Sequence, residues 1–116
     1  MRILFITLLS CHIMINLFVS DILPKIREYF KSQPVRKAWL FGSFSRNEET
    51  EASDIDILVD YDESKGMVSL FKMGGMLMEL SRIAGRHVDL VEVNGIMDFA
   101  KASIERDKIL IYEREN

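Results

Sequence analysis

Two aspartates open the second of two apolar segments in this chain, and their spacing places both carboxylates on one side. Asp54 and Asp56 flank Ile55 at the start of the segment 53–60. If that segment is a strand, its side chains alternate between the two faces, so the two aspartates share one face. Two carboxylates so close together repel each other unless a cation lies between them, and hard divalent ions take oxygen ligands. The pair therefore predicts a divalent metal site.

A Gly-Ser pair follows the first apolar segment, 35–41, directly before the polar loop that leads to the aspartates. Gly42 and Ser43 predict a turn whose backbone N–H groups and hydroxyl suit an anion, most naturally a phosphate. A metal site beside a phosphate site predicts phosphoryl or nucleotidyl transfer.

A third carboxylate lies within a later apolar strand, predicted at 86–93. Asp89 stands among valine and leucine residues, and burying an unpaired charge is costly. An edge strand with a wet face, or an ion pair with Arg86, would each account for it. Beside the Asp54 and Asp56 pair, Asp89 is expected to be a third metal ligand. His87, on the same face as Asp89 by alternation, is expected to be a surface residue.

The spacing of these residues resembles a known signature. Gly42-Ser43, ten residues, then Asp54-Ile55-Asp56 is similar to the G-S-x10-D-x-D pattern of the DNA polymerase β-like nucleotidyltransferases, and the short length resembles their minimal nucleotidyltransferase branch. The run 88–91 is similar to the strand on which that family carries its third carboxylate. The resemblance extends from about residue 21 to the C-terminus and implies a palm fold, of the α+β class, with a mixed sheet.

The resemblance also implies roles for these residues. Asp54 and Asp56 would hold two Mg²⁺ ions, and Asp89 would complete the second site and help to deprotonate the acceptor hydroxyl. Gly42 and Ser43 would hold the outer phosphates of a nucleoside triphosphate, with ATP as the expected co-substrate.

Arg46 is the remaining candidate for nucleotide binding. An arginine at this place in the family often faces the phosphates, and a guanidinium group suits them; a surface arginine paired with the nearby glutamates is the alternative. Many relatives have a glycine where this chain has Asn47, and asparagine also tolerates a left-handed backbone.

Minimal nucleotidyltransferases of this kind are often encoded beside a helical HEPN protein, act as its antitoxin, and in some cases transfer AMP from ATP to a tyrosine of that toxin. The resemblance therefore implies Mg²⁺-dependent transfer of a nucleotide to a hydroxyl of a partner protein. Two alternatives stay open: transfer to a small hydroxylated molecule such as an aminoglycoside, and a non-catalytic antitoxin that occludes its toxin.

Composition limits the classes of partner. The 116-residue chain has a formal net charge of −3, which argues against the basic surface that non-specific nucleic-acid binding needs. Its single cysteine, Cys11, cannot form an intramolecular disulfide. A cytoplasmic enzyme is expected, because nucleotides and their Mg²⁺ complexes are abundant there. Association into homo- or hetero-oligomers is left open.

The first 19 residues form an apolar leader, and one nucleotidyltransferase domain is predicted at 20–116. Three interpretations of the leader compete: an over-extended start, with Met14 as the true first residue or the leader merely packing on the domain; a secretory or lipoprotein signal around Cys11; or a membrane anchor, for which the segment is barely long enough.

The elements expected to position the site alternate between strands and amphipathic helices. Helices are predicted at 21–31, with Ser20 as N-cap, at 67–84 and at 96–106, with a closing strand at 109–112. The resulting small mixed sheet is expected to carry its helices on one side. The inward stripe of the second helix is predicted to comprise Leu70, Met73, Leu77, Leu80 and Ala84, widened by Phe71, Met76 and Ile83.

Overall fold

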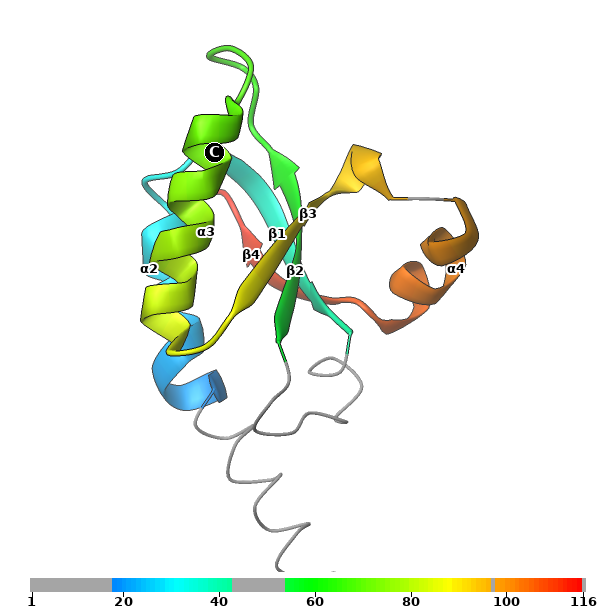
Figure 1. Cartoon of the computed structure of the whole chain (residues 1–116), viewed down its shortest axis with the longest axis horizontal. Coiled ribbons are helices and arrows are strands. Elements are labelled where there is room, and N and C mark those ends of the chain that lie inside the picture. The colour runs from blue at the N-terminus through cyan, green and yellow to red at the C-terminus, as the bar shows by residue number, and fades with distance from the viewer. Residues whose placement is uncertain (1–17, 43–53, 97, 116) are drawn as a thin grey trace, which may run out of the picture.

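A four-stranded mixed sheet forms the centre of the molecule in the computed structural model, which describes residues 18–42, 54–96 and 98–115. The strands lie side by side in the order β3-β2-β1-β4 (Figure 1). In chain order the elements are the π turn η1 (Phe18–Ile22), α2 (Leu23–Phe30), β1 (Val35–Phe41), β2 (Ile55–Tyr61), α3 (Leu70–Ala84), β3 (Val88–Glu92), the 3-10 turn η2 (Val93–Gly95), α4 (Asp98–Asp107) and β4 (Ile109–Glu113). This architecture confirms the predicted α+β class with a mixed sheet.

The direction of the strands follows from how they are connected. β1 pairs with β2 and with β4 in antiparallel fashion, whereas β2 and β3 run parallel. A parallel pair requires a crossover connection, and α3 supplies it between β2 and β3. The two parallel strands therefore begin at the same end of the sheet, β2 at Ile55 and β3 at Val88.

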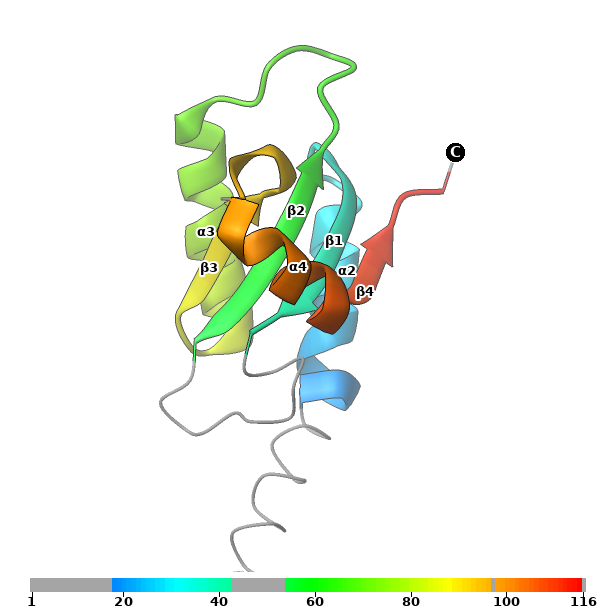
Figure 2. The ribbon, with the colours of Figure 1, turned by 90° about the vertical axis from the view of Figure 1, so that its right-hand side faces the viewer.

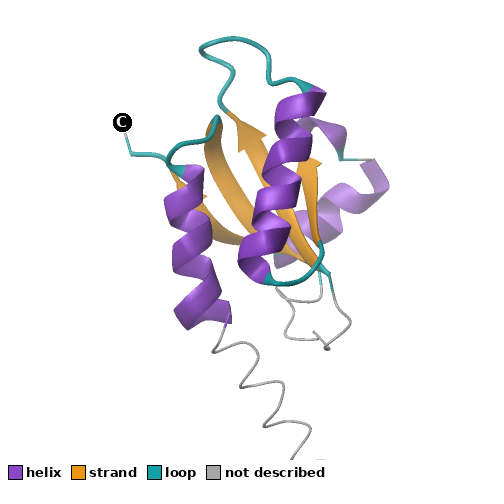
Figure 3. Cartoon of the chain, turned by 60° about the vertical axis from the view of Figure 1, so that its left-hand side comes forward, coloured by secondary structure: helices purple, strands orange, loops and turns teal. Residues whose placement is uncertain are grey.

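The hydrophobic core lies between the sheet and the helices α2 and α3, which stand side by side on one face (Figure 3). Ile55, Ile57 and Val59 point to this face from β2, and each is completely buried. They meet Phe30 of α2 and Leu80 of α3, which are equally inaccessible to solvent. Alternate residues of one strand thus supply the floor of the core.

α4 lies on the opposite side of the sheet from α2 and α3, and this corrects the expectation that all helices share one side (Figures 1 and 2). Leu58 is completely buried although it points away from the main core, and Trp39 is its partner across β1 and β2. The ammonium group of Lys108, which follows α4, lies 4.6 Å from the centre of the Trp39 ring.

The predicted inward stripe of the long helix is correct at its C-terminal end and wrong at its start. Met76, Leu80 and Ala84 are buried, but Leu70 is 85% exposed and Phe71 94% exposed. The helix has apolar residues on most of its circumference, so periodicity alone does not identify the face that packs. The large exposed apolar residues of α3 are Leu70, Phe71 and Met78, and Met67, just before the helix, is exposed as well.

Capping residues set the ends of α3, whereas the first helix begins differently from the prediction. Ser69 accepts a hydrogen bond from the Lys72 N–H, and Gly85 closes the helix with a left-handed φ of 68°. Ser20 is not an N-cap: η1 runs continuously into α2, and the Ser20 hydroxyl donates to its neighbour Asp21 instead.

The apolar leader, apart from Phe18 and Val19 at the start of η1, falls outside the described residues. Among the helices that the structure describes, none combines the length and apolar character needed to cross a membrane.

Candidate functional site

The parallel pair of strands brings the predicted carboxylates together. In the register of β2 and β3, Asp56 lies directly opposite Asp89, and Ile55 lies opposite Val88. Because Ile55 and Val88 are completely buried in the core, alternation turns Asp56 and Asp89 to the other face of the sheet. Both carboxylates are half-buried there, away from α2 and α3.

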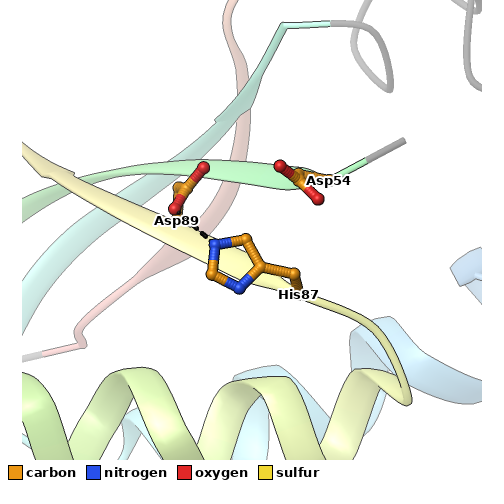
Figure 4. A group of neighbouring side chains, drawn as sticks. All are labelled: Asp54, His87 and Asp89. Atoms are coloured by element: carbon orange, nitrogen blue, oxygen red, sulfur yellow. Dashed lines mark hydrogen bonds and ion pairs between the residues drawn. The ribbon is translucent and has the colours of Figure 1, made fainter. Parts of the chain in front are cut away.

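Asp54 and His87, each two residues nearer the edge on the same face, extend this group. The ligand atoms of Asp54, His87 and Asp89 all lie within 4.8 Å of one another, and Figure 4 shows the three side chains gathered where β2 and β3 begin. The Nε2 atom of His87 is 2.8 Å from Oδ1 of Asp89. The predicted juxtaposition of Asp54 with Asp89 is therefore present. His87 is exposed, as predicted, and its ring also lies beside these two carboxylates.

Asp56 occupies a separate place in the site, next to the Gly-Ser turn. Gly42 follows β1 with a positive φ of 75°, and a Cβ atom at this position would overlap a carboxylate oxygen of Asp56. A residue with a side chain is therefore disfavoured twice here, because its backbone would be strained and the Asp56 carboxylate would have to shift. The sequence predicts only a phosphate-binding role for Gly42. The antiparallel pairing of β1 with β2 brings Gly42 close to Asp56.

Two of the predicted nucleotide contacts, Ser43 and Arg46, lie outside the described residues. The described residues on either side of them, Gly42 and Asp54, both lie at the group of carboxylates. The two roles remain predictions.

The donor set fits a divalent cation. Carboxylate oxygens suit Mg²⁺, Ca²⁺ and Mn²⁺, while an imidazole nitrogen suits transition metals. Asp54, Asp56 and Asp89 gather negative charge on one partly exposed face, and no lysine or arginine among the described residues is recorded in an ion pair with Asp54 or Asp89. A bound cation would relieve that repulsion.

Asp60 shows that position, not residue type, defines the site. It shares the face of Asp54 and Asp56 by alternation but lies near the far end of β2, where its partner in the register is Lys37. At about 3.3 Å per residue, four residues place it about 13 Å from Asp56, too far to contact the same ion.

A surface hollow of about 700 Å³ lies elsewhere, between α2 and the end of β4. Its lining includes Arg27, Lys31 and Arg114, but none of the acidic residues of the site. This hollow is therefore separate from the candidate site formed by the carboxylates.

Comparison with known proteins finds a matching family and several relatives. The model of the family described as polymerase beta nucleotidyltransferase matches residues 24–116. A relative from Methanocaldococcus jannaschii, named as a candidate protein adenylyltransferase, is 40% identical over 95 residues, which span 80% of this chain and 94% of the relative.

Solved structures resemble the fold at lower identity. A crystal structure of a toxin-antitoxin with AMP-PNP has a TM-score of 0.62 at 18% identity, covering 82% of this chain and 73% of the other. A structure of a tri-AMPylated HEPN toxin from Shewanella oneidensis in complex with MNT antitoxin has a TM-score of 0.54 at 16% identity, covering 90% of this chain and 73% of the other.

Proposed function

The chain belongs to the polymerase β nucleotidyltransferase family, and from this premise we propose that it transfers AMP from ATP to a hydroxyl group of a partner protein. As a member of the family it is a nucleotidyltransferase. The observation that carries the finer proposal is the register of β2 and β3, which sets Asp56 against Asp89 and Asp54 beside both His87 and Asp89.

Asp54, Asp56 and Asp89 would hold Mg²⁺, with Asp54 and Asp56 shared between two ions and Asp89 completing the second. When bound, the ions would neutralise phosphate charge and polarise the reacting oxygens. The residues on this face are suited to that task because they are acidic, adjacent and partly open to solvent.

The chemistry is an exchange of one P–O bond for another. The acceptor oxygen forms a bond to the α-phosphorus of ATP, the bond from that phosphorus to the β-phosphate oxygen breaks, and pyrophosphate leaves. Asp89 receives the proton of the acceptor hydroxyl and passes it to solvent. Asp89 suits this role because half of its side chain remains accessible, so a proton can leave.

The Gly-Ser turn would orient the triphosphate. Gly42 is placed beside Asp56, so a phosphate held by the turn would lie next to the carboxylates. Ser43 and Arg46 would add a hydroxyl and a guanidinium group to the same phosphates.

The expected acceptor is a helical, HEPN-type toxin, with this chain as its antitoxin. The support is the likeness to relatives named as protein adenylyltransferases and to MNT antitoxin in complex with AMPylated HEPN toxin. A cytoplasmic location suits a reaction that consumes ATP.

Label transfer tests the proposal. The full chain is incubated with Mg²⁺, ATP labelled on its α-phosphate and a lysate of its source cells. A labelled protein band is expected, and Asp54→Asn should reduce labelling by about 100-fold or more, since several kcal/mol of charge stabilisation depend on the metal site.

Asp60→Asn provides the matched control, because it makes the same change on the same strand and face, away from the site. It should retain labelling within about twofold. Equal labelling by the wild type and Asp54→Asn would contradict the proposed site. Labelling of a small molecule in place of a protein would mean that the acceptor is a small hydroxylated molecule. An absence of transfer despite Mg²⁺-dependent ATP binding would favour an antitoxin that occludes its toxin without catalysis.

A further inference from the structure

His87 is the one member of the Asp54, His87 and Asp89 group that the proposed function does not use. Its ring lies in the group, with Nε2 2.8 Å from Oδ1 of Asp89 (Figure 4). We propose that His87 supplies a nitrogen ligand to the ion held by Asp54 and Asp89, and so shifts the metal preference of this position from Mg²⁺ toward Mn²⁺. The inference rests on the proposed metal-dependent transfer and deepens it.

The backbone on both sides of His87 is fixed, so the side chain has a defined direction. Its carbonyl accepts a hydrogen bond from the Ile55 N–H at 3.0 Å, which continues the parallel ladder by one residue beyond β3. The following N–H, of Val88, donates to the Ser81 hydroxyl of α3 at 3.2 Å. With Val88 buried in the core, alternation turns His87 to the same face as Asp89.

The spacing of the ligand atoms suits one shared ion. Ligands at about 2.0–2.2 Å from a metal and at right angles to each other are about 3 Å apart, and opposite ligands are about 4.2 Å apart. The 2.8 Å between His87 and Asp89 matches adjacent ligands. The 4.8 Å limit for the whole group exceeds the opposite-ligand distance by a few tenths of an ångström, which small side-chain rotations remove.

The chemistry of the donors determines the preference. Mg²⁺ takes oxygen ligands and keeps much of its water, so a nitrogen adds little to its binding. First-row transition ions gain from imidazole, and Mn²⁺ also accepts the carboxylates that complete this site. The imidazole is 57% exposed, so an ion reaches it without rearrangement of the core.

The competing role for His87 is to orient Asp89 through their hydrogen bond without touching the ion. His87→Gln separates the two roles, because its amide can donate to Asp89 but has no ring nitrogen. His87→Ala removes both roles. Each substitution is at an exposed position outside the core, so the folded state is expected to persist.

Metal binding to the full chain without nucleotide tests the inference. Mn²⁺ affinity is measured by titration, Mg²⁺ affinity by competition with Mn²⁺, and the nitrogen by pulsed electron paramagnetic resonance of bound Mn²⁺. The wild type should show coupling to a directly bonded nitrogen. His87→Gln and His87→Ala should both lose that coupling and about 10- to 100-fold in Mn²⁺ affinity, with Mg²⁺ affinity changed by less than about threefold.

The other histidine of the chain gives the matched control: His12→Ala should retain both coupling and affinity. Bound Mn²⁺ without nitrogen coupling in the wild type, or full Mn²⁺ affinity in His87→Gln, would overturn the role of His87 and leave the proposed function intact. Failure of the wild type to bind either ion would overturn both this inference and the proposed metal dependence. Label transfer reports on the proposed function independently of these results.

Discussion

The two faces of the sheet are built from the same strands and have opposite properties. On β2, Ile55, Ile57 and Val59 are completely buried under α2 and α3, while the intervening Asp56 and its predecessor Asp54 point to the other face. A slip of one residue in the register would exchange the two sets. The core therefore fixes the register, and the register in turn places the carboxylates.

The core under the helices contributes mainly to stability, whereas the carboxylates on the other face are the candidates for chemistry. The helix-covered face removes large apolar side chains from water, which is the main favourable term in folding. The acidic face concentrates like charges, which favours ion binding and contributes repulsion to the ion-free fold. Substitutions in the core under α2 and α3 should therefore affect mainly stability, and substitutions at the carboxylates should affect mainly transfer.

The largest expected effect is on the helix-covered face. Phe30 is completely buried, and its ring centre lies 5.4 Å from that of Tyr112. Phe30→Ala should lower the free energy of unfolding by about 3–5 kcal/mol through lost transfer energy and the cavity left behind. Denaturant unfolding measures this loss, and transfer per folded molecule should be unchanged.

Phe30→Leu is the matched variant, because it retains most of the apolar volume. It should lower the free energy of unfolding clearly less than Phe30→Ala does. A loss below about 1 kcal/mol for Phe30→Ala would mean that the core of the helix-covered face does not set stability.

The second effect lies on the acidic face. Gly42→Ala combines a left-handed backbone with a Cβ that overlaps the Asp56 carboxylate. It should cost about 1–2 kcal/mol of stability from the backbone alone, and it should reduce transfer by about tenfold or more because Asp56 is displaced.

Gly85→Ala is a close control for this prediction. Gly85 has a similar φ of 68°, but a Cβ there meets nothing within 4 Å. It should lose a similar amount of stability and retain transfer within about twofold. If both variants lose transfer equally, the close approach of Gly42 to Asp56 has no functional role.

The smallest effect lies at the end of β2 remote from the site. Hydrogen bonds from the side chain and then the N–H of Ser64 lower the pKa of the Asp62 carboxyl from its ordinary value of 3.8, and the Arg114 guanidinium group, 3.0 Å from Asp62, lowers this pKa further. The folded-state pKa is below the unfolded value, so the stabilisation is complete above about pH 4 and is lost as the pH falls through the folded-state pKa.

Asp62→Asn should therefore reduce stability slightly at neutral pH and flatten its decline below pH 4, without changing transfer. Unfolding measured from pH 2 to pH 7 tests this, with the neighbouring Glu63→Gln as control. An unchanged acid-side slope in Asp62→Asn would contradict the assigned ion pair and hydrogen bond.

Local patterns predicted much of the fold. The strand 35–41 has the predicted limits, and the other strands and helices differ from their predicted limits by one to three residues. Such errors arise because caps and pairing partners set the ends of elements. The sequence pattern also predicted that Asp56 and Asp89 lie within strands, and Asp54 directly precedes β2 in the structure.

The packed face of α3 was harder to predict, and the reason is physical. Phe71 and Met78 are as apolar as Met76 and Leu80, so the hydrophobic pattern fits more than one orientation of the helix. In the structure, the buried side chains of α3 are those that pack against the core-facing residues of β2 and β3.

The sequence by itself determined which residues could form the site: the carboxylates, their period of two and the glycine before them are local properties. The tertiary structure decided which of these residues meet. The parallel pairing of β2 with β3 sets Asp56 opposite Asp89 and brings His87 into the group, and the antiparallel pairing of β1 with β2 brings Gly42, directly after β1, against Asp56. These contacts join residues far apart in the chain, and the burial of a shared core fixes the register that creates them.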